Sequence, residues 1–178
     1  EEIRKNPRIS DKLSVYFLEN YCVTMSELLM PACDISEQIS LAGTEASGTG
    51  NMKLMLNGAI TLGTLDGANI EIGDAVGPEN ILIFGMKTEE VNTLKARGYR
   101  PEDYYNNNPV IKSCIDRMYA GINGCKFTEV ADSLRTLDPY MVLADFDSYC
   151  QVQEHSSKLY TDKDTWTKMS LHNIANAG

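Results

Sequence analysis

The sequence predicts an α/β protein in which a parallel sheet is flanked by helices. Three short runs of apolar and β-favouring residues have the pattern of strands, and they cover residues 13–18, 59–65 and 80–85. Helical patterns separate these runs, and strands that alternate with helices favour a parallel sheet. From residue 99 onward the pattern is mainly helical.

The first strand and the first helix lie in the N-terminal part of the chain. Residues 13–18, Leu-Ser-Val-Tyr-Phe-Leu, predict a short buried strand because apolar and β-favouring residues dominate the run. Thr24 and Glu27 then have the spacing of a capping box, in which a hydroxyl and a carboxylate each bond the other residue's backbone N–H. Pro31 is expected to end this helix.

The later helices are predicted from residues that begin and end helical segments. Thr88 can cap a helix that closes at Gly98, and Pro101 can open another. Residues 145–176 have a helical pattern with breaks near Tyr160. The strands are therefore expected in the first half of the chain.

Composition limits the classes of partner. The 178 residues include 16 Lys and Arg against 25 Asp and Glu, a formal net charge of −9, so nucleic acid and anionic membrane surfaces are repelled on average. No apolar run approaches the roughly 20 residues of a membrane helix. Five cysteines without a C-x-x-C pair fit a reducing cytosol. We expect a cytoplasmic protein that binds neither nucleic acid nor membrane and has no metal site.

The length fits one domain, or half of a larger two-domain enzyme. We expect residues 1–178 to be a single incomplete domain, with an α/β part over residues 1–98 and a mainly helical part over residues 99–178. The chain begins at Glu1 rather than Met and stops directly after a helical pattern. Excision from a longer polypeptide therefore stays open.

Residues 43–58 carry the strongest chemical pattern. Residues 43–50 contain three glycines and three hydroxyl residues, and a short helix over residues 51–56 follows and is closed by Asn57-Gly58. Free N–H groups and the positive end of the helix dipole make such a loop a ready anion site. The loop matches neither a P-loop nor a dinucleotide fingerprint. On glycine content by itself, a structural turn fits as well as a phosphate site.

Lys53 adds a second chemical feature. Its neighbours Met52, Leu54, Met55 and Leu56 are apolar, so the short helix is expected to be buried nearly all round. A buried ammonium must reach water, pair with an acid or form a Schiff base with an aldehyde. Because the neighbouring loop suits a phosphate, a Schiff base with an aldehyde that carries its own phosphate competes with the other two explanations. Pyridoxal 5′-phosphate is such a ligand.

A family resemblance rests on these residues. Residues 45–57, Glu-Ala-Ser-Gly-Thr-Gly-Asn-Met-Lys-Leu-Met-Leu-Asn, resemble the pyridoxal-phosphate attachment signature of the glycogen, starch and maltodextrin phosphorylases. The resemblance covers essentially the whole chain and is densest over residues 15–85. It implies a Rossmann-like parallel sheet flanked by helices, in the C-terminal domain of a GT-B glycosyltransferase, with a helical C-terminal section.

The resemblance also implies an activity. Members of that family use inorganic phosphate to release the terminal glucose of an α-1,4-glucan, glycogen or maltodextrin, as α-glucose 1-phosphate (EC 2.4.1.1). The cofactor phosphate acts as a proton shuttle, which a phosphate monoester with a second pKa of about 6 can do. The parent protein is expected to be a homodimer. This chain by itself is expected to be inactive, because the N-terminal lobe of the same polypeptide is missing.

The resemblance assigns four residues to the cofactor. Lys53 holds pyridoxal 5′-phosphate as a Schiff base and is counted as catalytic. Thr49 and Gly50 match the positions that bind the cofactor phosphate, and Tyr21 matches a position beside the cofactor.

The resemblance assigns three residues to the sugar. Glu45, Ser47 and Gly48 match positions that hold hydroxyls of the reacting glucose, and Glu45 is also counted as catalytic. A carboxylate accepts well from two adjacent hydroxyls. Asp66 and Asn69 are expected only to cap and turn the chain after a strand.

Two other functions stay open. A pyridoxal-phosphate aminotransferase or decarboxylase would also bind its cofactor through Lys53, but the sequence offers no recognisable acid for the pyridine nitrogen. A stand-alone half-domain could bind sugar or phosphate without turnover. The sequence does not distinguish glycogen, starch and short maltodextrin as the preferred glucan.

Overall fold

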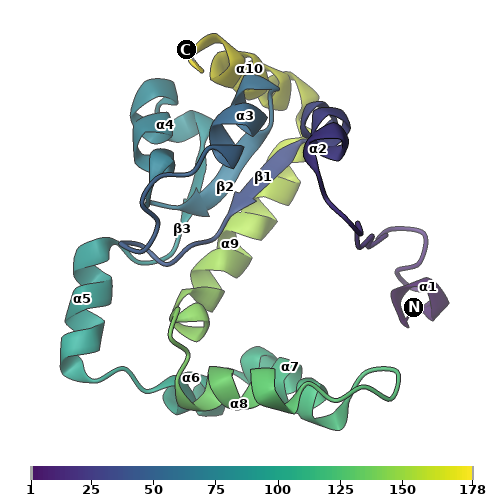
Figure 1. The fold of residues 1–178 in the computed structure, drawn as a ribbon, viewed down its shortest axis with the longest axis vertical. Helices are drawn as coiled ribbons and strands as arrows, with labels where there is room; N and C mark the ends of the chain where they lie inside the picture. The colour runs from purple at the N-terminus through teal and green to yellow at the C-terminus, as the bar shows by residue number, and fades with distance from the viewer. Residues whose placement is uncertain (1, 178) are drawn as a thin grey trace.

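A three-stranded parallel sheet organises the protein in the computed structural model, which describes residues 2–177 (Figure 1). The strands, in spatial order, are β1 (Ile35–Gln38), β2 (Ile60–Thr64) and β3 (Leu82–Phe84). Ile35 lies opposite Ile60, and Leu62 lies opposite Leu82. The central strand β2 is buried at every position, as expected for a parallel strand with both faces covered.

Helices make up most of the remaining chain (Figure 1). In chain order they are α1 (Glu2–Lys5), α2 (Val23–Leu29), η1 (Met30–Ala32), α3 (Gly50–Leu56), α4 (Ala68–Val76), η2 (Pro78–Asn80), α5 (Thr88–Arg97), α6 (Pro101–Asn107), α7 (Pro109–Ala120), α8 (Thr128–Thr136), α9 (Val142–Thr161) and α10 (Lys163–Ala175). Within residues 2–177, no helix has the length and apolar character needed to cross a membrane.

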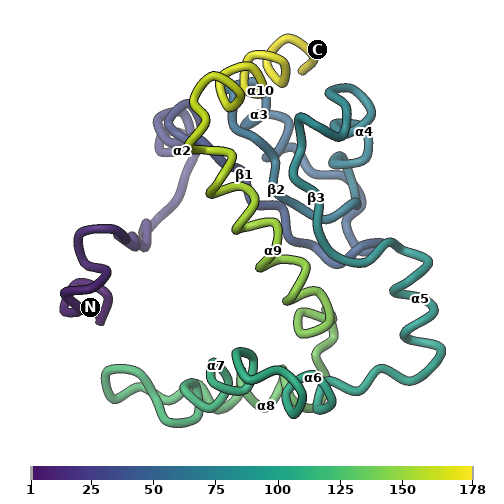
Figure 2. Tube along the Cα trace, turned by 180° about the vertical axis from the view of Figure 1, so that it is seen from behind, coloured from purple at the N-terminus to yellow at the C-terminus, as the bar shows by residue number. Residues whose placement is uncertain are grey.

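The two faces of the sheet are covered by different helices, as Figures 1 and 2 show from opposite sides. Successive residues of a strand point to opposite faces. Ile60 and Leu62 pack with Val152 of α9 and with Trp166 and Met169 of α10. The face with α3 and α4 has its own apolar cluster, made by Met55, Ile72, Val76 and Ile81. The sheet is therefore the middle of three layers.

The predicted α/β class and parallel sheet are confirmed. Residues 59–65 and 80–85 contain β2 and β3, and both pairings are parallel. Strand β1 was not predicted, because its four residues include Ser36 and Glu37 and form no apolar run. The division of the chain at residue 98 stays a prediction.

The predicted strand over residues 13–18 is wrong. These residues have no secondary structure, and the side chain of Phe17 is 89% exposed. The segment leads from α1 to α2 away from the sheet (Figure 1). A strand needs a neighbour that pairs its N–H and C=O groups, and no described residue supplies one here. The composition of residues 13–18 favours a strand, but without backbone hydrogen bonds to a neighbouring strand none forms.

The predicted capping box is also wrong, although the helix itself is confirmed. Helix α2 begins at Val23 with Cys22 as its N-cap, so Thr24 already lies inside the helix. The Ser26 hydroxyl donates to the Val23 carbonyl at 2.7 Å. The α-helix ends at Leu29, before Pro31 as expected, and Pro31 lies in the short 3-10 helix η1 that follows.

The later helices are confirmed with small shifts. Helix α5 closes at Gly98, whose φ of +88° favours glycine, but its N-cap is Lys87 rather than Thr88. Pro101 opens α6 as predicted. The predicted break near Tyr160 lies at Asp162, between α9 and α10.

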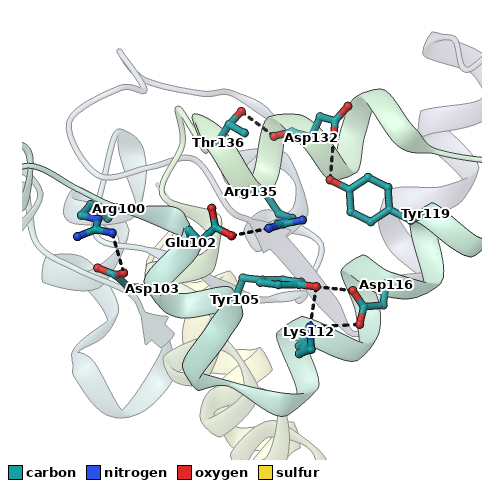
Figure 3. A network of polar contacts seen from close by, with 10 residues as sticks. All are labelled: Arg100, Glu102, Asp103, Tyr105, Lys112, Asp116, Tyr119, Asp132, Arg135 and Thr136. Atoms are coloured by element: carbon teal, nitrogen blue, oxygen red, sulfur yellow. Dashed lines mark hydrogen bonds and ion pairs between the residues drawn. The ribbon is translucent and has the colours of Figure 1, made fainter.

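A polar network centred on Tyr105 joins helices α6, α7 and α8 (Figure 3). The Lys112 ammonium donates to the Tyr105 hydroxyl at 2.7 Å, and that hydroxyl donates to Asp116 at 2.5 Å. The charged groups of Lys112 and Arg135 also lie 4.2 and 4.3 Å from the centroid of the Tyr105 ring. Arg135 in turn pairs with Glu102. The buried ring is thus the common contact of three helices.

Substitution of Tyr105 should show how much this ring contributes. Tyr105→Ala is expected to lower the free energy of unfolding by about 3–5 kcal/mol, because a buried aromatic side chain is lost. Tyr105→Phe keeps the ring and should cost on the order of 1 kcal/mol, since only the hydroxyl contacts are lost. Urea unfolding followed by circular dichroism measures both values. Equal losses for the two variants would contradict the central role of the ring.

Asp145 connects the start of α9 to the end of β3. Its carboxylate accepts from the Met86 N–H at 2.9 Å, and the nearby Ser148 hydroxyl accepts from the Gly85 N–H at 2.9 Å. Burial raises the pKa of the Asp145 carboxyl, and the negative charges of Asp138 and Glu90 add to that rise. The ionised form is therefore disfavoured in the folded protein.

This shift predicts a pH dependence. A carboxyl whose folded pKa is raised contributes its stability at low pH and loses it as the pH rises through the folded pKa. Asp145→Asn keeps an acceptor for the Met86 N–H but cannot ionise. The variant should therefore gain stability relative to the parent as the pH rises above 3.8, the ordinary pKa of the carboxyl, and through its raised folded pKa. Urea unfolding of both proteins across this range is the test, and a constant difference would contradict it.

Candidate functional site

Residues 39–49, which we call the glycine loop, lie at the carboxyl end of the parallel strands. The loop leaves β1 after Gln38 and enters α3 at Gly50. The Thr64 hydroxyl, at the end of β2, donates to the Ser40 carbonyl at 2.5 Å and fixes the start of the loop beside the sheet. Ligands of open α/β sheets bind outside the carboxyl ends of the strands. The predicted site therefore occupies the usual place for a ligand in such a fold.

The expectation that Lys53 is buried is wrong. Only Asn51 and Met55 are buried in α3, whereas Lys53 is exposed and Met52 and Leu56 are 42% and 58% exposed. The helix packs one face against the sheet and leaves the other open (Figure 1). The Lys53 ammonium can therefore remain hydrated, and its charge requires no buried partner.

Lys53 lies one helical turn from Thr49 and Gly50. The Lys53 N–H donates to the Thr49 carbonyl at 3.2 Å, which closes that turn. Side chains in an α-helix lean toward its N-terminus, so the Lys53 stem extends toward the glycine loop. A Cβ added at Gly50 would meet no atom within 4 Å. An exposed amine one turn from a glycine and a hydroxyl at a helix start is a donor set that suits a phosphorylated aldehyde.

The residues predicted to hold glucose lie together in the loop. Glu45 and Ser47 are exposed, and the Glu45 carboxylate accepts from the Ser40 hydroxyl at 3.3 Å. Gly48 has a φ of +136°, which favours glycine. Ser47 also borders an open hollow of about 390 Å³ beside α3 and α4. The loop can thus offer a carboxylate and a hydroxyl side by side.

Tyr21 is the one predicted site residue from outside this segment. It lies before Cys22, the N-cap of α2, and is 59% exposed. Within residues 2–177, no hydrogen bond or ring contact links Tyr21 to the glycine loop or to Lys53. Its role beside the cofactor stays a prediction.

Three polar residues that sequence reasoning treated as structural or left aside support the loop. Asp66 accepts from the Glu45 N–H at 2.8 Å, and the Asn51 amide donates to Asn69 at 2.8 Å. Burial raises the pKa of Asp66, but the backbone N–H donors of the loop outweigh it and lower the pKa overall. The run of residues 64–69, with a carboxylate and an amide directly after a buried strand, was the available signal.

Comparison with known proteins identifies the family. The family model described as carbohydrate phosphorylase matches residues 1–178. The chain belongs to the carbohydrate phosphorylase family. It is 46% identical over 180 residues to the muscle form of glycogen phosphorylase from Homo sapiens and, equally, to the glycogen phosphorylase of Synechocystis sp.. It is 44% identical to the human brain form over the same length.

The phosphorylase matches cover 99% of this chain but only 21% of each relative. The chain therefore spans about a fifth of the length of these glycogen phosphorylases. Family membership confirms the resemblance found in residues 45–57.

Proposed function

We propose that these residues form the cofactor-binding part of an α-glucan phosphorylase that carries pyridoxal 5′-phosphate on Lys53. The observation that carries the proposal is the segment of residues 45–53, in which an acid, a glycine loop and a lysine follow one another at the carboxyl end of the parallel strands. In this proposal the segment belongs to the C-terminal domain of a cytoplasmic, dimeric GT-B enzyme. The N-terminal lobe of the same polypeptide supplies the rest of the site.

The cofactor is held by α3 and the residue before it. Thr49 and Gly50 bind the cofactor phosphate, because the first N–H groups of a helix have no partner within it. Lys53 would attach the cofactor covalently, and Tyr21 would lie beside it. When bound, the cofactor supplies a phosphate that can give and take a proton near neutral pH.

The loop orients the terminal glucose. The Glu45 carboxylate accepts from two adjacent sugar hydroxyls, while Ser47 and the Gly48 N–H complement them. In the overall reaction, the bond from the anomeric carbon to the glycosidic oxygen breaks, and an oxygen of inorganic phosphate bonds to that carbon with retention. The glycosidic oxygen takes up the proton that inorganic phosphate gives up, so atoms and charge balance. The products are α-glucose 1-phosphate and a glucan shortened by one unit.

The segment as a separate molecule is proposed to bind without turnover. Glu45, Ser47 and Lys53 are all exposed, so water reaches each of them, and catalysis of this kind depends on water exclusion. The isolated chain should release no glucose 1-phosphate from maltodextrin and inorganic phosphate. Release above the buffer blank would overturn this part of the proposal.

Covalent labelling tests the cofactor site directly. The protein is incubated with pyridoxal 5′-phosphate, reduced with borohydride and digested, and its peptides are mapped by mass. A phosphopyridoxyl adduct on Lys53 is the expected result. If the segment gives no adduct, the same mapping is repeated on the full-length chain that contains it. Absence of the adduct there would overturn the proposed function.

A further inference from the structure

Asp66 holds the backbone of the glycine loop from the turn that follows β2. Its side chain is buried, with 7% of the residue exposed. One carboxylate oxygen, Oδ2, accepts from the Thr44 N–H at 3.0 Å and from the Glu45 N–H at 2.8 Å. Both donors lie outside any helix or strand, so the sheet does not pair them. The Thr44 N–H is shared with the Leu41 carbonyl at 3.0 Å, so within residues 2–177 the Glu45 N–H is the donor that depends on the carboxylate for its hydrogen bond.

Gly67, the next residue, packs closely against the same loop. Gly67 has a φ of +52°, and a Cβ added there would come within 2.8 Å of the Glu45 Cγ and within 2.8 Å of the Ser47 carbonyl oxygen. Only glycine fits at this distance. The turn formed by Asp66 and Gly67 thus lies against Glu45 and Ser47, two of the three loop residues that are proposed to hold the sugar.

A separate pair of amides holds the helix side of the site. The buried Asn51 side chain, in α3, donates to the side-chain oxygen Oδ1 of Asn69 at 2.8 Å, and the Asn69 Nδ2 donates to the Thr64 backbone carbonyl at 2.9 Å. This connection fixes the start of α3, and with it Lys53, to the end of β2. The sugar side and the cofactor side of the loop are therefore held by different side chains.

We propose that Asp66 is a positioning residue, which fixes the Glu45 backbone so that the Glu45 carboxylate meets the glucose hydroxyls. The attachment of the cofactor to Lys53 does not depend on Asp66. This inference rests on the proposed function. Asp66 acts through two amides of the loop and makes no hydrogen bond to α3 among the described residues. Its loss should therefore affect glucan binding and turnover while Lys53 keeps its adduct.

Kinetics of the full-length holoenzyme give the first test. Asp66→Ala is expected to raise KM for glucan and to lower kcat/KM on the order of 10²-fold, because a small misplacement of a positioning group has effects of that size. Asp66→Asn keeps one neutral acceptor and should lose less, since charge-assisted hydrogen bonds are about twice as strong as neutral ones. Asp74→Asn, at an exposed acid of α4, is the matched control and should match the parent.

The Lys53 adduct separates positioning from folding. A residue that only stabilises the fold would, when replaced, lower the amount of adduct and the activity together. Full adduct yield in Asp66→Ala with a raised KM supports the proposal. An unchanged KM, or a loss of adduct that parallels the loss of activity, overturns it.

Amide signals give a second readout that does not depend on activity. In nuclear magnetic resonance spectra of the chain, the amide protons of Thr44 and Glu45 should titrate together with the Asp66 carboxyl, and this titration should vanish in Asp66→Asn. Amides that do not titrate in the parent overturn the inference. Titrating amides in a full-length holoenzyme that shows no phosphorolysis would overturn the proposed function and still support Asp66 as the residue that holds the loop.

Discussion

Replacing Lys53 by arginine is expected to abolish the phosphopyridoxyl adduct at position 53 and to leave the fold intact. A guanidinium stays protonated and cannot add to the cofactor aldehyde. Lys53 is exposed on α3, and arginine is a good helix former, so stability should change by less than about 0.5 kcal/mol. Borohydride reduction with peptide mapping measures the adduct, and urea unfolding measures the stability.

A second lysine controls for labelling without a specific site. Lys95 is exposed near the end of α5, far along the chain from the glycine loop. Lys95→Arg should leave the adduct on Lys53 at the parent's level. The assignment of the cofactor to Lys53 fails if Lys53→Arg carries as much adduct in total as Lys95→Arg does.

The site could be predicted from sequence because most of it is continuous in the chain. Residues 45–53 bring an acid, hydroxyls, glycines and a lysine into one loop and one helical turn, so their closeness follows from covalent connection and helix geometry. Whether Lys53 is buried or exposed could not be predicted in the same way. Met52 and Leu56 are apolar but remain exposed, because which face of a short helix meets the sheet depends on distant residues.

Strand pairing limited the prediction of the fold. The run over residues 13–18 has a better strand composition than β1, yet only β1 is a strand. Four of its residues, from Ile35 to Gln38, are paired with β2, about 25 positions later in the chain. Local propensity is a weak guide where long-range pairing provides the hydrogen bonds.

The support of the loop by Asp66 also depends on long-range contacts. Asp66 bonds the amides of residues 21 and 22 positions earlier. The sequence indicated a cap or turn after a strand, which is the role that such a residue usually has. Only the fold brings this turn against Glu45 and gives the carboxylate a place in the site.

Replacing Gly63 by alanine is expected to disturb the fold and the site together. Gly63 lies in β2 opposite Gln38 of β1, and an added Cβ would lie 2.5 Å from the Gln38 carbonyl oxygen and 2.8 Å from the Asn69 amide nitrogen. The strand backbone cannot easily move, so the free energy of unfolding should fall by about 1–3 kcal/mol or more. Displacement of Asn69 also weakens its bond to Asn51, so the yield of the Lys53 adduct should fall.

The same substitution at Gly73 separates packing from local propensity. Gly73 lies within α4, and a Cβ there would meet no atom within 4 Å. Alanine is favoured over glycine inside a helix, so Gly73→Ala should raise stability by about 0.5–1 kcal/mol. Opposite signs for the two variants in urea unfolding would show that contact with Gln38 and Asn69 determines the effect at Gly63. If the Gly63→Ala protein is as stable as the parent and carries as much Lys53 adduct, the idea that the packing of Gly63 against Asn69 supports Lys53 is wrong.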